Sequence, residues 1–183
     1  AERNHIRSVP EPAAHDGVAV VPGDTYFGQQ WGFHNTGQEF YCIAWVFGDL
    51  CFFYGTPGAD IDAPEAWAIS TGSPTVTVAV IDTGIDYNHP DLADNMFRNT
   101  ADCNVNGVDD DGNGYADDCH GIDPFNGDSN PLDDNNHGTH CAGIIGAEGE
   151  NNLGIAGVNW KVKIMPLKFM NAGGAGSTKD AIE

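Results

Sequence analysis

One segment restricts the possible folds more than any other. Residues 75–81 are rich in β-branched side chains, end in four consecutive apolar residues and run directly into Asp82. A continuous apolar run of this kind is typical of a strand buried on both faces of a parallel sheet. Sites in open α/β sheets lie just past the carboxyl ends of such strands. The pattern therefore predicts a functional Asp82, the alternative being an Asp that only begins the Asp82-Thr83-Gly84 turn.

Strand and helix signals alternate along the rest of the chain. The pattern predicts a helix at 62–69 with Asp62 as its cap, a helix at 137–147, a strand at 161–170 and a last helix capped by Ser177 or Thr178. Pro166 weakens the strand prediction, because proline cannot donate to a sheet ladder. This order predicts an α/β fold, a parallel sheet with helices on both faces.

His137 opens the predicted helix 137–147. Gly138 and the small residues after it allow this helix to pack closely on a strand, which would bring the imidazole beside Asp82. A carboxylate that accepts the Nδ1 proton holds the imidazole in the tautomer that can take a proton from a nucleophile. Two alternatives remain. His137 could be a helix cap, or His137 and His140 could be metal ligands, although the Glu and the spacing of the HExxH zinc motif are missing.

Two motifs surround these residues: VIDTGID at 80–86, followed by HPDL at 89–92, and HGTHCAG at 137–143. In this order they resemble the subtilisin-like serine proteases, the subtilases. The resemblance implies that Asp82 orients His137 and that His137 is the general base of an Asp-His-Ser triad that hydrolyses peptide bonds.

The resemblance extends from about Ala59 to Glu183 and implies a subtilisin-like fold truncated before its C-terminal half. We expect residues 1–23 to be a pro-segment remnant or flexible arm, and 24–183 the N-terminal part of the catalytic domain. Three residues match the edge segment on which an extended polypeptide substrate adds as a strand: Gly174, Ala175 and Gly176. The chain lacks an initial Met and ends within a predicted helix, so we expect a fragment.

The family's nucleophile lies in a Gly-Thr-Ser-x-Ala motif, preceded by an Asn of the oxyanion hole, and neither occurs in this chain. We therefore expect serine endopeptidase activity of the full-length protein, acting as a monomer, and none of this chain alone. The alternative is a non-catalytic calcium-binding or inhibitory module derived from a truncated protease gene. An aspartic protease, suggested by Asp82-Thr83-Gly84, is excluded because no second such triplet occurs.

A second candidate site is acidic: fourteen of the twenty Asp lie within 82–134, where Arg98 is the only Lys or Arg. One loop places oxygen ligands at positions 1, 3, 5, 7 and 9 of an EF-hand-like calcium loop: Asp109, Asp111, Asn113, the carbonyl of Tyr115, and Asp117. Position 12 is His120 instead of Glu, so we expect a Ca²⁺ loop without an EF-hand fold, completed by Asp118 or Asp123. A solvated Asp-rich turn is the alternative.

The resemblance also implies a second calcium site. In relatives such as thermitase, an N-terminal Asp, the Asp of the HPDL segment and an Asn-rich loop share one Ca²⁺. These ligands fall here on Asp24, Asp91 and Asn152. The Asn-rich loop is one residue shorter than the family's pattern, so the second site is a weaker expectation than the first.

The five cysteines form two close pairs and one remainder. Cys42 with Cys51 and Cys103 with Cys119 are expected to form disulfides in an oxidising compartment, the alternative being free thiols. Cys141 is left over. It is similar to the Cys of the proteinase K branch, which suggests sensitivity to mercurials, but a small buried hydrophobe is the preferred interpretation.

The formal net charge of −20 excludes nucleic acid as a favourable partner. No apolar run approaches the roughly 18 to 20 residues that a membrane-spanning helix needs, so no membrane association is expected. The resemblance to the subtilases implies a secreted or extracellular protein, where an oxidising compartment would favour the two expected disulfides.

Overall fold

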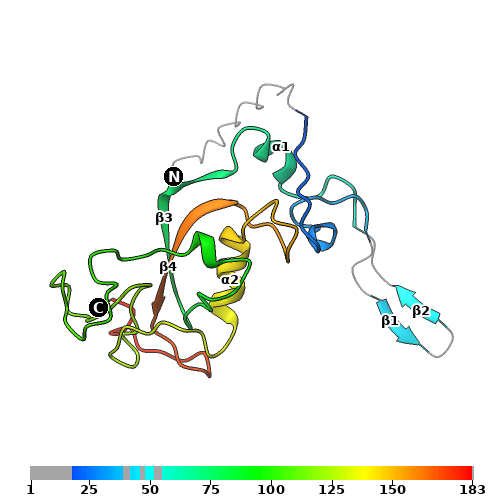
Figure 1. Ribbon diagram of the computed structural model, residues 1–183. Coiled ribbons are helices and arrows are strands. Elements are labelled where there is room, and N and C mark those ends of the chain that lie inside the picture. Colours follow the sequence, from blue (N-terminus) through cyan, green and yellow to red (C-terminus); the bar gives the residue numbers. More distant parts are fainter. Residues whose placement is uncertain (1–17, 39–41, 46–47, 52–54, 183) are drawn as a thin grey trace, which may run out of the picture.

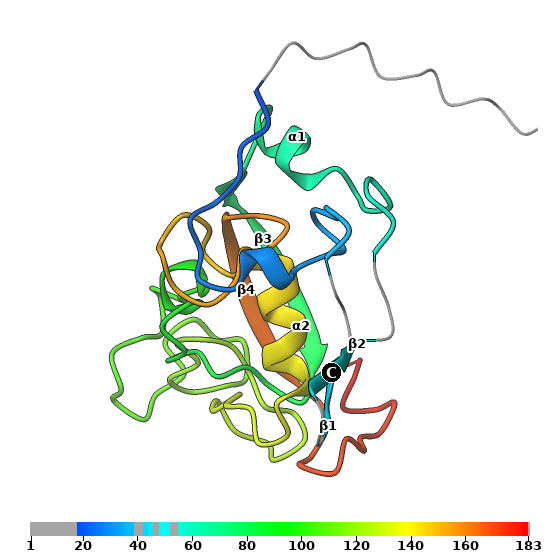
Figure 2. The same ribbon diagram turned by 90° about the vertical axis from the view of Figure 1, so that its right-hand side faces the viewer.

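The computed structural model describes residues 18–38, 42–45, 48–51 and 55–182. At its centre, β3 (Gly72–Asp82) and β4 (Lys161–Lys168) form a two-stranded parallel sheet, and α2 (His137–Gly146) packs against both strands (Figure 1). A view turned by 90° shows α2 lying across one face of this sheet (Figure 2). The strand, helix, strand order predicted from the sequence is therefore present.

The register of the sheet brings both carboxyl ends to one edge. Val80 lies opposite Pro166, and Asp82, the last residue of β3, lies opposite Lys168. The amide of Lys168 points away from β3, because it donates to the carbonyl of Ile122 on the other side. Pro166 is two residues earlier and faces the same side, where isolated bridges replace a continuous ladder. The missing amide of Pro166 therefore costs the β3–β4 pairing nothing.

The burial of β3 differs from the prediction. Val80 is buried against α2, but Val76 and Ile81 are 52% and 50% exposed. In the described part of the chain, α2 covers the face of the strand that carries Val80, and the next residue, Ile81, points to the other face. β3 is therefore half-buried here, because burial on both faces needs a packing layer on each side.

α2 packs closely because its inward side is made of small residues. Gly138, Ala142, Gly143 and Gly146 are all buried. A Cβ at Gly146 would lie 2.5 Å from Val162 of β4, so a larger residue would push the helix off the sheet. The 3-10 turn η2 (Ala93–Asn95) flanks this core, and the buried amide of Asn95 donates to the carbonyls of Gly146 and Trp160 at 2.9 Å each.

A second, aromatic cluster joins the N-terminal segment to the body. It contains Phe27 from η1 (Phe27–Gln29), Trp67 from α1 (Ala63–Trp67) and Trp160 before β4. The helix predicted at 62–69 is thus present but shorter. Asp62 precedes it in the left-handed region (φ 53°) and makes no side-chain cap bond.

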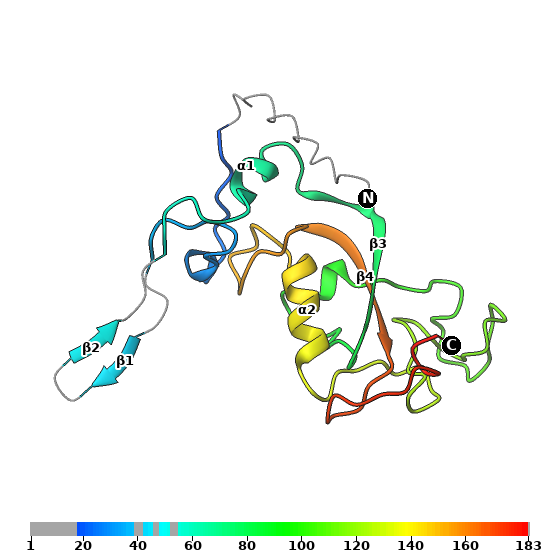
Figure 3. The same cartoon turned by 180° about the vertical axis from the view of Figure 1, so that it is seen from behind.

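Two short strands, β1 (Cys42–Trp45) and β2 (Gly48–Cys51), pair as an antiparallel sheet. It stands away from β3, β4 and α2 in two opposite views (Figures 1 and 3). The antiparallel register places the Cα atoms of Cys42 and Cys51 opposite each other. Their side chains lie outside the described part of the structure, so the disulfide between them stays a prediction.

The last helix predicted from the sequence is only a turn. The amide of Asp180 donates to Ser177 Oγ, which is the hydrogen bond expected of a capping Ser. No α-helix follows among residues up to 182. A few residues are too short to compensate the cost of helix nucleation without packing. Among the described residues, no helix is long and apolar enough to cross a membrane.

Candidate active site

Asp82 and His137 meet at the carboxyl end of the sheet. Asp82 ends β3 and His137 begins α2. The Nδ1 atom of His137 lies 2.8 Å from Oδ1 and 2.9 Å from Oδ2 of Asp82. The structure thus brings together the two side chains that the sequence patterns single out.

The pair has the polarity of a general base and its orienting acid. An ionised carboxylate only accepts hydrogen bonds, so the proton of the neutral ring lies on Nδ1 and Nε2 keeps its lone pair. The side chain of His137 is 66% exposed, whereas that of Asp82 is 13% exposed. Nε2 can therefore reach a group in solution while Asp82 stays behind the ring.

Two glycines allow the elements that carry the pair to approach. A Cβ at Gly138, in the first turn of α2, would collide with the carbonyl oxygen of Gly84. Gly84 itself has φ +101° and leaves no room for a Cβ beside the carbonyl of Pro131. Glycine is therefore required at both positions of this close contact.

Cys141 lies one turn after His137 on α2. Its Sγ is 3.9 Å from His137 Nδ1, and it is the one free cysteine whose side chain the structure describes. Burial raises the pKa of the thiol, and the negative charges of Asp82 and Asp133 raise it further. The thiol is therefore protonated at neutral pH and is no competing nucleophile. Oxygen, nitrogen and sulfur atoms of Asp82, His137 and Cys141 lie within 4.8 Å of one another, which is compatible with a soft metal.

The glycine-rich segment predicted to receive substrate follows β4. Gly174, Ala175 and Gly176 are exposed, and Gly176 forms an isolated antiparallel bridge with Met170. Asn135, two residues before His137, donates from Nδ2 to the carbonyl of Ala172 at 2.7 Å. The segment is thus tied to the loop that leads into the His137 helix.

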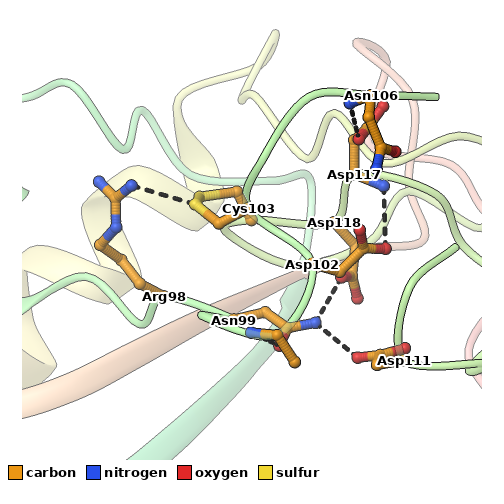
Figure 4. Close-up of a disulfide and its surroundings, with 10 residues drawn as sticks. Arg98, Asn99, Asp102, Cys103, Asn106, Asp111, Asp117 and Asp118 are labelled. Carbon is orange, nitrogen blue, oxygen red and sulfur yellow. Dashed lines mark hydrogen bonds between the residues drawn. A yellow bond between two sulfur atoms is a disulfide. The ribbon is translucent and has the colours of Figure 1, made fainter. Parts of the chain in front are cut away.

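The acidic loop at 101–120 has no regular secondary structure and is held by its own carboxylates (Figure 4). Three of them converge: oxygen atoms of Asp102, Asp109 and Asp111 lie within 4.8 Å of one another. Asp102 is fully buried, yet its Oδ1 has no hydrogen-bond partner. Burial raises the pKa of Asp102, because the charged carboxylate is desolvated there.

All the predicted ligands of the acidic loop that are named by a side chain, Asp109 and Asp111 included, have hydrogen-bond partners in or beside the loop. Asp117 accepts from the amides of Asn106 and Gly107 at 2.8 and 2.9 Å. Asn113 Oδ1 accepts from the amide of Tyr115 at 2.9 Å. Asp117 lies outside the group of three carboxylates. The structure therefore joins Asp109 and Asp111 to Asp102, a residue that the EF-hand spacing leaves out.

The residues proposed for a second calcium site also lie close in the chain's fold. Asp24 and Asp91 are buried, 6% and 3% exposed. Asp24 Oδ2 accepts from the amide of Glu150 at 2.8 Å, while its Oδ1 has no partner. Asp91 Oδ2 accepts from the amide of Ile155, and Asn152 lies between these two loop positions with φ 64°.

Cys103 and Cys119 form a disulfide, so the predicted bridge is present. It closes the acidic loop with a sequence separation of 16. Arg98 donates from Nη2 to Cys103 Sγ at 3.0 Å, beside Asn99, which donates to Asp111 and Asp118 (Figure 4).

Sequence patterns miss two carboxylates that these sites use. Asp102 lies seven positions before the loop motif, so no spacing rule includes it. Asp133, four residues before His137, accepts hydrogen bonds from Thr83 and Thr139. The signal that could have found Asp133 is its place just ahead of a helix, where Asp often caps.

Comparisons with known proteins agree with this geometry. Residues 73–183 match the model of the subtilase family, the Peptidase_S8 family. The chain is 40% identical over 119 residues to subtilisin-like protease 1 of Plasmodium berghei, covering 64% of this chain and 20% of that protein. It is 30% identical over 178 residues to the thermophilic serine proteinase of Bacillus sp. strain AK1, covering 97% of this chain and 33% of that protein.

A solved structure supports the fold alone. The serine protease of Aeromonas sobria, in complex with its chaperone, matches with a TM-score of 0.63 at 23% identity, over 89% of this chain and 23% of that chain. The chain thus spans a third or less of the length of each of these relatives. The matched family model covers most of the chain and includes both Asp82 and His137, and we conclude that the chain belongs to the subtilase family.

Proposed function

We propose that this chain supplies the acid and the base of a serine endopeptidase triad. The observation that carries the proposal is the contact of His137 Nδ1 with both oxygens of Asp82, at the carboxyl end of β3. In peptide hydrolysis, His137 Nε2 takes the proton of an attacking serine hydroxyl, and Asp82 stabilises the imidazolium that forms. His137 then returns that proton to the leaving amine.

The nucleophilic serine is supplied from outside residues 1–183. The four serines in the described part of the chain hydrogen-bond elsewhere: Ser70 to Gly72, Ser73 to Thr75, Ser129 to Ala116 and Ser177 to Asp180. We therefore expect this chain alone to be inactive, and the full-length protein to act as a secreted monomer.

The substrate is an extended polypeptide. Gly174, Ala175 and Gly176 are exposed, and Asn171 already engages the amides of Gly174 and Ala175 and the carbonyl of Ala175. The remaining backbone groups of this segment are the ones that would bond to one more strand, which gives affinity for any extended peptide. The absence of side chains at Gly174 and Gly176 lets a second backbone approach.

We propose that Ca²⁺ stabilises the acidic loop. Asp102, Asp109 and Asp111 offer hard oxygen ligands, and the buried, unpartnered Oδ1 of Asp102 fits a cation that replaces its lost hydration. Asp24, whose Oδ1 is also buried and unpartnered, would hold a second Ca²⁺ with Asp91 and Asn152.

The test is covalent labelling of the full-length protein with a fluorophosphonate, which reacts only with an activated serine. Labelling of one serine in calcium buffer is expected, together with its loss in His137→Ala. The control is Asp94→Asn, an exposed residue outside the pair and outside the proposed ligands, which should leave labelling unchanged. A full-length wild-type protein that binds Ca²⁺ but takes up no label contradicts the protease function.

A further inference from the structure

The residue that follows the acid of the pair is held from two sides. Thr83 is 1% exposed. Its Oγ1 donates to Asp133 Oδ1 at 2.8 Å and accepts from the amide of Gly138 at 3.0 Å. Its carbonyl oxygen accepts from Lys168 Nζ at 2.5 Å. The turn after Asp82 is therefore anchored through both the side chain and the backbone of Thr83.

Asp133 connects this turn to the start of α2. Its Oδ2 accepts from the amide and the hydroxyl of Thr139, at 2.9 and 2.5 Å. Its Oδ1 also accepts from the amides of Asn135 and Asn136. Asn136, the residue at the cap position, makes no side-chain cap bond, so Asp133 takes over the capping of α2 from outside the helix.

Several hydrogen bonds to one carboxylate favour its charged form. Burial tends to raise the pKa of Asp133, but the hydrogen bonds from Thr139, Asn135 and Thr83 outweigh it, and the pKa is lowered. Asp133 is therefore ionised at neutral pH and accepts all these bonds at once.

Lys168 holds the same turn from the sheet. Its side chain is 2% exposed, and it lies opposite Asp82 in the β3–β4 register. Besides the Thr83 carbonyl, its ammonium donates to Asp134 Oδ1 at 2.7 Å. Asp133 and Asp134 are consecutive, so the loop before His137 is tied to Thr83 by one direct bond and by one through Lys168.

We propose that Asp133 and Lys168 are positioning residues of the protease, which set the Asp82–His137 contact by fixing Thr83 to the loop that leads into α2. The proposal rests on the proposed function. Asp82 and His137 come from elements 55 residues apart, and no covalent link holds them in place. A displacement of about 1 Å in such a pair lowers the rate by ~10²-fold.

The test compares isosteric variants in the full-length protein. Thr83→Val removes the hydroxyl, and Asp133→Asn removes the charge at constant volume. Each is expected to lower kcat by ~10²-fold with KM changed less than ~3-fold, because neither residue touches substrate. Thr83→Ser keeps the hydroxyl and should recover kcat to within ~3-fold of wild type. Thr75→Val, on the exposed part of β3, is the matched control and should leave kcat unchanged.

A readout independent of turnover separates this proposal from the protease function. The Nδ1 proton of His137, assigned by its absence in His137→Gln, is followed by NMR in the full-length protein. A slowly exchanging downfield resonance is expected in wild type, Thr83→Ser and Thr75→Val. It should broaden or disappear in Thr83→Val, Asp133→Asn and Lys168→Met.

The outcomes are distinct. If the resonance and kcat persist in folded Thr83→Val and Asp133→Asn, the positioning role is wrong. If one of these variants does not fold, as shown by circular dichroism, the other decides. If wild type takes up no fluorophosphonate, the protease function fails, while the resonances still decide whether Asp133 and Lys168 position His137.

Discussion

The Asp82–His137 pair and the acidic loop at 101–120 are both built around carboxylates, but the two regions differ in the hydrogen-bond donors that these carboxylates receive. Around the pair, regular elements place donors on each carboxylate: His137 Nδ1 donates to Asp82, and Thr83 and Thr139 donate to Asp133. In the acidic loop, three carboxylates face one another and Asp102 Oδ1 has no donor.

This difference shows where each region obtains its stability. A buried carboxylate with enough hydrogen bonds needs no other partner, whereas one without a donor retains the cost of its desolvation. The pair can therefore keep its geometry from the chain alone. The acidic loop is closed by a covalent bridge, Cys103–Cys119, and under our proposal a cation from solution offsets its charges.

The largest expected effect is on turnover at the pair. In the full-length protein, His137→Ala or Asp82→Asn should lower kcat by ~10⁴ to 10⁶, the magnitude known for removal of triad members in subtilisin itself. The measurement is hydrolysis of a peptide substrate under saturating conditions. Asp109→Asn, in the acidic loop, should leave kcat nearly unchanged when calcium is saturating. A loss of kcat in Asp109→Asn as large as that in the pair variants would contradict the view that only the pair takes part in turnover.

Opening the disulfide should destabilise the acidic loop. Changing both Cys103 and Cys119 to Ser is expected to lower the free energy of unfolding by about 3 kcal/mol, since the bridge closes a loop between residues with a sequence separation of 16. Urea unfolding, followed by circular dichroism, gives this value. Cys141→Ser, which breaks no bridge, is the control. An unchanged midpoint in the double variant would contradict a stabilising role for the bridge.

Calcium removal should act on the acidic loop next. At calcium 100-fold above its dissociation constant, one site contributes about 2.7 kcal/mol, so EDTA should lower Tm. Asp102→Asn should lose most of this response, and in EDTA it should be at least as stable as wild type because its buried group carries no charge. Differential scanning fluorimetry measures both. The exposed Asp94→Asn should respond like wild type; a full calcium response in Asp102→Asn would exclude Asp102 as a ligand.

On acidification, Asp133 and Asp102 should change the stability of the folded protein in opposite directions. The pKa of Asp133 is lowered in the folded protein, so its contribution is complete above the unfolded value of about 3.9 and is lost as the pH falls through the folded pKa. The pKa of Asp102 is raised, so in EDTA its charge destabilises at neutral pH, and stability returns as the pH falls below the folded pKa.

The measurement for this smallest effect is the Tm difference between wild type and each Asn variant, from neutral pH to about pH 3. The Asp133→Asn deficit should shrink on acidification, and so should the Asp102→Asn advantage in EDTA. If Asp133→Asn and Asp102→Asn both raise the Tm, or both lower it, at neutral pH in EDTA, the protein does not stabilise one carboxylate and destabilise the other.

Local patterns were sufficient for the elements that carry the pair. The apolar run before Asp82 and the small residues after His137 describe a strand and a helix through contacts a few residues long, and β3 and α2 are present near the predicted bounds. The same reasoning overestimated two features that depend on distant packing: burial of β3 on both faces, and a helix after Ser177.

The sequence by itself determined the family and the order of strand, helix and strand, and it singled out Asp82 and His137, because each rests on short-range periodicity or on a contiguous motif. Only the tertiary structure decided which other carboxylates matter. Asp102 joins Asp109 and Asp111, and Asp133 and Lys168 meet at Thr83, through turns and strand pairing that bring distant positions together. Burial and hydrogen-bond satisfaction are properties of that packing, and no spacing along the chain encodes them.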